Sequence, residues 1–174
     1  MRFFSVLLFT LFASVCASAA DPSESAVSEA SQMIRDGKAE CVLVRDNRIL
    51  YVERGRGVSP LLNVYDHHRA EMEGAVVVDK VIGRAAACIA ICGKVKHVHG
   101  EIMSEDAVEF LKENGITASS TLLVPRILNR KRDGLCPLEK SVEGIRDPEK
   151  ALTALRAKVE ALSAGMKQNH SNQK

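Results

Sequence analysis

The sequence predicts an α/β fold, a three-layer α/β/α sandwich built on one mixed sheet. Two β-type runs, at 39–45 and 48–54, are separated only by Asp46-Asn47, a pair that favours a tight hairpin turn. The run GAVVVD at 74–79 is uninterrupted and branched-aliphatic, which is typical of a strand covered on both faces. Strand and helix patterns then alternate, so we expect parallel crossovers with helices on both faces of the sheet.

The other elements follow from apolar spacing and from the residues that break it. Gly37, Gly93 and Gly115 end three predicted helices, and Ser104 begins the last of these as its N-cap. We expect helices at 28–35, 60–68, 80–93, 104–115, from Pro137 and 148–163, and strands at 95–103 and 121–125.

The composition is that of one globular domain with a hydrophobic core. The chain has 174 residues, of which 46% are hydrophobic. Its net charge of +2 provides no basic surface for duplex nucleic acid, and the absence of Trp, with 4% aromatics, provides no stacking platform for single strands. We therefore expect no nucleic-acid partner.

The N-terminus has the pattern of a secretory signal peptide. Arg2 precedes an apolar run at 3–15 and the small-residue stretch CASAA, with cleavage expected after Ala20. The run is too short for a comfortable membrane span, and Val15 disfavours a lipoprotein reading of Cys16. We expect an exported protein without membrane attachment after cleavage.

With this signal peptide, we expect the chain to have four parts. The divisions are a signal peptide at 1–20, a polar linker at 21–27, a single domain at 28–163 and a disordered tail at 164–174.

The first candidate site is the step from the predicted strand to the next helix, where Asp79 and Lys80 stand. The carboxyl end of a buried strand opens into a crevice, and a helix start offers unpaired N–H groups to an anion. Gly83 would keep that helix start slim enough for a ligand. An ion pair, or Asp79 as a simple N-cap with Lys80 in solvent, is an equal alternative.

The second candidate site is the stretch NRKRDGLCPLEKSV at 129–142. Cys136 precedes a Pro that suits the first helical turn, and Glu139 follows at capping-box spacing. A thiol at an N-cap is favoured as thiolate, although a half-buried structural Cys is an equal reading. Asn129 and Arg130 belong to the one tight basic cluster and could hold an anion, with a solvated loop as the alternative.

No metal or cofactor is expected. None of the His and Cys groups has a recognised zinc spacing. The groups tested are His67, His68 and Glu71, the pair His97 and His99, and the pair Cys88 and Cys92.

Taken in order, GRGVSPLL, GAVVVDKVIGRAAA, VPRILNR and GLCPLEKSV resemble a bacterial family of unassigned function with the cytidine deaminase-like fold. The resemblance covers about residues 35–158. DKVIG is also similar to a pentapeptide of the formate dehydrogenase accessory sulfurtransferase branch. The resemblance implies the fold but no mechanism, because both the Pro-Cys-x-x-Cys of zinc deaminases and the sulfur-carrying Cys-x-x-Cys are absent.

Three functions remain open on the sequence alone. The first is binding of a small anionic or nucleotide-like ligand through Lys80, Gly83, Asn129 and Arg130. The second is a metal-independent enzyme in which Cys136 is the nucleophile and Asp79 or Glu139 moves protons. The third is an exported structural or interaction protein, and a homo-oligomer is compatible with each of the three.

Overall fold

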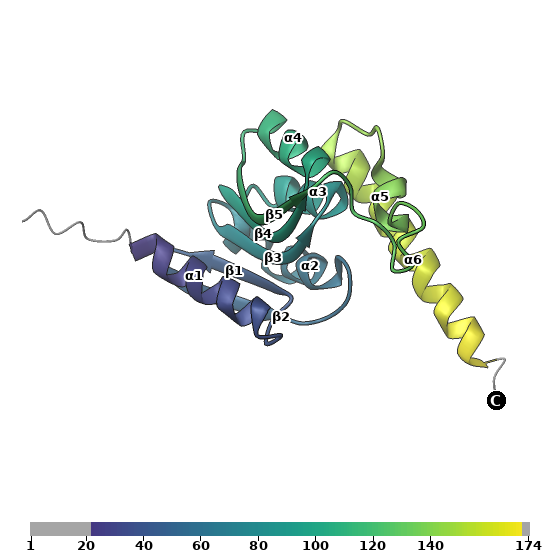
Figure 1. The fold of residues 1–174 in the computed structure, drawn as a ribbon, viewed down its shortest axis with the longest axis horizontal. Helices are drawn as coiled ribbons and strands as arrows, with labels where there is room; N and C mark the ends of the chain where they lie inside the picture. Colours follow the sequence, from purple (N-terminus) through teal and green to yellow (C-terminus); the bar gives the residue numbers. More distant parts are fainter. Residues whose placement is uncertain (1–21, 172–174) are drawn as a thin grey trace, which may run out of the picture.

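A computed structural model describes residues 22–171, with side chains from 26 to 165. Its sheet has the strand order β2-β1-β3-β4-β5 (Figure 1). The strands are β1 (Cys41–Arg45), β2 (Arg48–Glu53), β3 (Val76–Ile82), β4 (His97–Ser104) and β5 (Thr117–Val124). β1 runs antiparallel to β2 and β3, whereas β3, β4 and β5 run parallel. The expected mixed sheet of an α/β fold is confirmed.

The helices lie on both faces of this sheet (Figure 1). They are α1 (Pro22–Arg35), α2 (Ser59–Met72), α3 (Arg84–Cys92), α4 (Glu105–Glu113), α5 (Pro137–Val142) and α6 (Pro148–Ser171). α1 packs on one face, mainly against β3 and β1. α2, α3 and α4 cover the opposite face, and α5 and α6 pack on the outside of α3.

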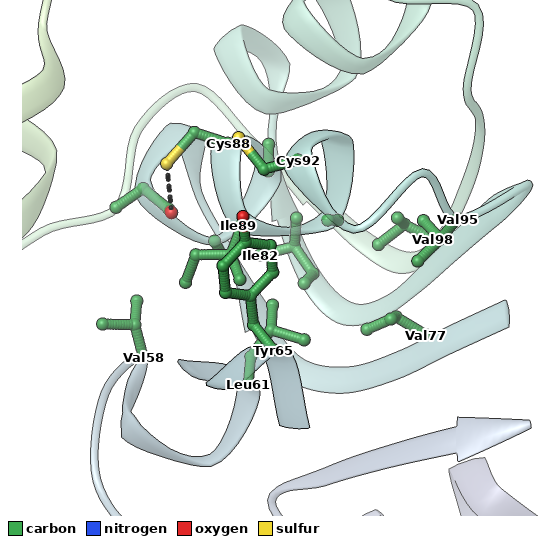
Figure 2. Close-up of a cluster of buried hydrophobic side chains, with 14 of the residues drawn as sticks. Val58, Leu61, Tyr65, Val77, Ile82, Cys88, Ile89, Cys92, Val95 and Val98 are labelled. Carbon is green, nitrogen blue, oxygen red and sulfur yellow. Dashed lines mark hydrogen bonds between the residues drawn. The ribbon is translucent and has the colours of Figure 1, made fainter. Parts of the chain in front are cut away.

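Two apolar clusters separate these layers. Val76 and Val78 face α1, whereas Val77 faces α3, because successive strand residues point to opposite faces. The larger cluster, on the α3 side, is shown in Figure 2 with Val77 and Ile89 among its members. Burial of this kind removes apolar surface from water, which is the main favourable contribution to folding.

The buried cysteines belong to the α3 side of the core. Cys41, Cys88 and Cys92 are buried, Cys136 is half-buried, and all four thiols are free. In Figure 2 the Cys88 thiol donates to the carbonyl of Ala85, at 3.1 Å. Burial raises the pKa of both the Cys88 and the Cys92 thiol to about 12, so both stay protonated. They act as small hydrophobic side chains.

The boundary between β3 and α3 differs from the expected one. We expected the strand to end at Asp79 and the helix to begin at Lys80, but β3 continues to Ile82. Asp79 pairs with Cys41 of β1 and Gly100 of β4, and the N–H of Lys80 donates to the carbonyl of Glu40 at 3.0 Å. Hydrogen bonds from both neighbouring strands therefore hold the two charged residues in an extended conformation.

Other boundaries shift for similar reasons. β5 begins at Thr117, ahead of the expected 121, because its polar residues pair with β4 although they lack apolar alternation. α1 begins at Pro22, within the stretch expected to be a linker, and α6 continues to Ser171, beyond the expected start of the tail. The predicted signal peptide lies outside the described residues. Within those residues no helix is both long enough and apolar enough to cross a membrane.

Candidate functional site

A hollow of about 520 Å³ lies beside the C-terminal ends of β4 and β5. It is lined by Ser104, the last residue of β4, and by Pro125, which follows β5. Arg84 at the start of α3 and Glu105 at the start of α4 line it as well. Ligands of open α/β sheets bind in crevices at these strand ends, so the hollow is the candidate site.

Charged side chains dominate the lining of the hollow. Its carboxylates are Glu105, Asp106, Glu109, Glu113, Glu139 and Glu143. Its cations are Arg84, Arg126 and Arg146. Six acids against three arginines give the lining a formal charge of −3.

Arg84 is the best-anchored of these cations. Its Nη1 donates to Asp106 Oδ1 and its Nη2 to the carbonyl of Ile145, each at 2.8 Å. Its guanidinium lies 3.9 Å from the centre of the Phe110 ring, a cation–π distance. Only 10% of the side chain is exposed, and its buried Nε has no hydrogen-bond partner among the described residues. Arg84 is therefore a fixed charge that links α3, α4 and the segment after α5.

Glu139 connects α5 to the start of α3. Its Oε2 accepts a hydrogen bond from the backbone N–H of Arg84 at 2.8 Å, and its Oε1 accepts one from that of Ala85 at 3.1 Å. The first N–H groups of a helix have no partner within the helix, so this carboxylate occupies the place of an anion at the N-terminus of α3. We expected Glu139 to cap its own helix; instead it caps a helix 55 residues away in sequence.

The position of Gly83 follows from this cap. A Cβ added to Gly83 would lie 2.4 Å from Oε1 of Glu139 and 2.6 Å from Oε2. The lack of a side chain at Gly83 does leave space at the start of α3, but the carboxylate of Glu139 occupies that space. Burial raises the pKa of Glu139, and the hydrogen bonds from the N–H groups of Ala85 and Arg84 counteract that rise.

Asp79 is buried away from the hollow, beside Cys41 on the α3 face of the sheet. Its Oδ1 accepts a hydrogen bond from the N–H of Val81 at 3.0 Å. Burial raises the pKa of Asp79 to about 7, a rise that this hydrogen bond and the Cys41 thiol only partly offset. Lys80 points to the other face, and its Nζ lies 3.1 Å from Oε1 of Glu40 in a half-exposed ion pair.

In the loop after β5, the predicted ligand-binding residue Asn129 makes its hydrogen bonds within the loop. Asn129 Nδ2 donates to Asp133 Oδ1 at 2.7 Å, and the N–H of Asp133 donates to Asn129 Oδ1 at 3.3 Å. Arg130 is exposed. Cys136 stands at the N-cap of α5, but its thiol makes no capping hydrogen bond.

Of the seven residues proposed from the sequence, the structure brings Gly83 and Glu139 into contact, and Glu139 alone lines the hollow. The other five, Asp79, Lys80, Asn129, Arg130 and Cys136, do not line it, so the two predicted segments do not form one pocket. Arg84 and the acids of α4 were missed. A signal for Arg84 was present, because an arginine at the head of an otherwise apolar, small-residue helix must find buried partners.

The residues around the start of α3 do not fit a zinc ion. Glu139, the carboxylate at that position, is held by two backbone N–H groups. Across the residues described, no group of three His, Cys, Asp or Glu side chains is placed to hold a metal ion.

An α/β domain with a charged hollow at its strand ends is thus the class of protein defined by the fold and the site. Residues 29–159 match the family model described as TM1506, domain of unknown function (DUF1893). The chain belongs to this family, for which no function is assigned.

One solved structure has the same fold as this chain, and two others align over little more than half of it. A crystal structure of a DUF1893 family protein (TM1506) from Thermotoga maritima aligns with a TM-score of 0.69 and 24% identity, over 76% of this chain and 88% of that one. Two forms of Acinetobacter baumannii RibD align over 57% and 58% of this chain, and 36% and 35% of theirs, at 16% identity. Their TM-scores are 0.43 and 0.41. No curated protein matches the chain.

Proposed function

We propose that the protein binds a small, positively charged molecule, such as an alkyl amine, in the hollow at the ends of β4 and β5. The observation that carries this proposal is the lining charge of −3 in a hollow large enough for a small molecule. The position of the hollow at the ends of parallel strands supports it independently.

The pairing of the charges inside the hollow favours a cationic ligand further. Arg84 is neutralised by Asp106, and Arg146 lies 4.0 Å from Glu113. The remaining cation of the lining is Arg126, and the lining also holds Glu105, Glu109 and Glu143, three acids that form no ion pair with any described residue. An amine placed about 4 Å from one such carboxylate gains on the order of 1 kcal/mol in bulk water and about 4 kcal/mol near a protein surface.

This proposal changes the charge of the ligand that the sequence suggested. An anionic or nucleotide-like ligand was expected from Lys80, Asn129 and Arg130, none of which lines the hollow. The helix start that would attract an anion already holds Glu139. Catalysis by Cys136 has no supporting contact, because its thiol does not line the hollow.

The relation to the cytidine deaminase-like superfamily and its sulfurtransferase branch belongs to the same proposal. A hairpin that leads into parallel crossovers supports the superfamily relation. In this proposal the domain is a metal-free binding module of that superfamily, exported with its signal peptide removed after Ala20.

Isothermal titration calorimetry with spermidine and with citrate tests the sign of the charge. Spermidine should bind the wild-type protein and citrate should not. The double variant Glu109→Gln/Glu143→Gln should bind spermidine at least about tenfold more weakly, a loss of about 1.4 kcal/mol. The matched control Glu29→Gln/Glu160→Gln, which changes exposed acids away from the hollow, should bind as the wild type does. Preferential binding of citrate, or an equal loss in both variants, would contradict the proposal.

Export is tested separately by expressing the full chain in a bacterium with a periplasm. Intact mass should show a product that begins at Asp21 in the periplasmic fraction. A product that retains residues 1–20 in the cytoplasm would contradict cleavage.

A further inference from the structure

β5 is an edge strand whose outer side has no partner among the described residues. It pairs with β4 on one side and ends the sheet on the other. All eight residues, TASSTLLV, are uncharged, and none is Pro. Edge strands of monomeric proteins are usually protected by charges, Pro or bulges. The opposite edge strand, β2, has Arg48 and Glu53 at its two ends, but β5 has no such protection.

Apolar side chains are exposed along this edge. Leu122 and Leu123 are 53% and 51% exposed, and they point to opposite faces of the strand. Leu122 continues a row of directly paired residues, Val81 on β3 and Ile102 on β4. Val81 is 37% exposed, so both ends of this row reach solvent. The open edge of β5 therefore adjoins an exposed apolar row.

We infer that β5 is the docking surface for a second copy of this chain, which pairs antiparallel with it to form one continuous sheet. A two-fold axis through the strand places the same patch on both copies, so the surface must complement itself. An uncharged strand meets this condition because no like charges face each other across the axis. A strand without charges also offers nothing that would select a charged peptide instead.

The area that each copy can bury at β5 indicates how strongly the two copies associate. Eight residues span about 26 Å at about 3.3 Å each. The sheet and the α4 layer together present an edge about 20 Å deep, or on the order of 500 Å² per copy. Stable dimers bury about 800 Å² per partner, so β5 pairing gives a weak dimer that dissociates on dilution.

The pairing also affects the hollow. Antiparallel alignment brings the start of one β5 beside the end of the other, where Pro125 and Arg126 begin the lining of the hollow. The second copy thus lies beside these lining residues, although the dimer does not depend on the ligand proposed above.

Sedimentation velocity on the purified chain across the micromolar concentration range tests the inference. The wild-type protein should show a reversible monomer–dimer equilibrium. Leu122→Glu, which places like charges near the two-fold axis, should weaken dimerisation at least about tenfold. Leu50→Glu is the matched control, since Leu50 is an exposed leucine on the opposite edge strand. It should leave the equilibrium unchanged.

Hydrogen exchange of the wild-type protein provides a second measurement that needs no variant. Amides of β5 should exchange more slowly at high than at low protein concentration, whereas those of β2 should not depend on concentration. A wild-type chain that stays monomeric throughout, a dimer that Leu50→Glu breaks and Leu122→Glu leaves intact, or protection confined to β2 would overturn the inference.

Discussion

The contact between Gly83 and Glu139 makes the strongest stability prediction. Gly83 has φ −106° and ψ −176°, a conformation open to any residue, so Gly83→Ala introduces no backbone strain. The cost comes from the added Cβ, which would lie 2.4 Å from Oε1 of Glu139. The carboxylate must move, and its hydrogen bonds to the N–H groups of Arg84 and Ala85 must lengthen or break.

The magnitude follows from those two hydrogen bonds. A hydrogen bond to a charged group contributes roughly 1.5–3 kcal/mol, and partial retention leaves an expected loss of about 2–4 kcal/mol for Gly83→Ala. Glu139→Ala removes the same hydrogen bonds and should cost a similar amount. The three atoms nearest the new methyl group all belong to the Glu139 carboxylate, so in the Glu139→Ala background Gly83→Ala should cost less than about 1 kcal/mol.

Urea unfolding of the wild type, both single variants and the double variant measures this coupling. Circular dichroism at each urea concentration gives the free energy of unfolding by linear extrapolation. The cycle should yield a coupling free energy of at least about 2 kcal/mol, well above the scatter of about 0.5 kcal/mol for independent sites. If Gly83→Ala costs the same in both backgrounds, the carboxylate of Glu139 does not lie over Gly83.

Three further predictions concern other buried groups. The pKa of Asp79 is about 7 in the folded chain against 3.8 as its ordinary value, so its contribution to stability is complete below pH 3.8 and is lost as the pH rises to about 7. Urea unfolding across this range should show a decline on the order of 4 kcal/mol that Asp79→Asn removes; an unchanged decline would rule out Asp79 as its source. Cys136 should react with a thiol probe before Cys88 and Cys92, because it is half-buried and they are buried; peptide mass spectrometry showing the reverse order would contradict the described burial. Arg84→Lys should lower the free energy of unfolding by about 1–3 kcal/mol, because an ammonium cannot reproduce both hydrogen bonds and the ring contact; an unchanged unfolding midpoint would refute that role.

The elements that depend on local pattern were predictable from the sequence. The hairpin at Asp46-Asn47, the buried strand and the alternating strands and helices all follow from residues close together in the chain. The end of β3 was not predictable. Two charged residues, Asp79 and Lys80, predict that the strand ends there. Pairing with β1 and β4 extends the strand instead, and the local sequence does not reveal this pairing.

The candidate site likewise depends on contacts that the local sequence does not predict. The spacing from Cys136 to Glu139 favours a local capping box, yet Glu139 caps the distant helix that Gly83 begins. From the sequence we expected a ligand to lie against Gly83; in the structure the carboxylate of Glu139 lies there. The packing of α5 on α3 determines which anion lies beside Gly83 and which residues form the neighbouring hollow. No pattern of nearby residues in the sequence predicts this packing.

Nuclear magnetic resonance titration of the purified chain with spermidine tests the central claim, that the hollow is a cation-binding site, most directly. Saturable shifts should be confined to backbone amides around the hollow, at residues 104–106, 126–127 and 143–144. The same titration with citrate should leave these amides unchanged. Shifts that cluster around Lys80 or Arg130 instead, or citrate shifts larger than those of spermidine, would contradict the account.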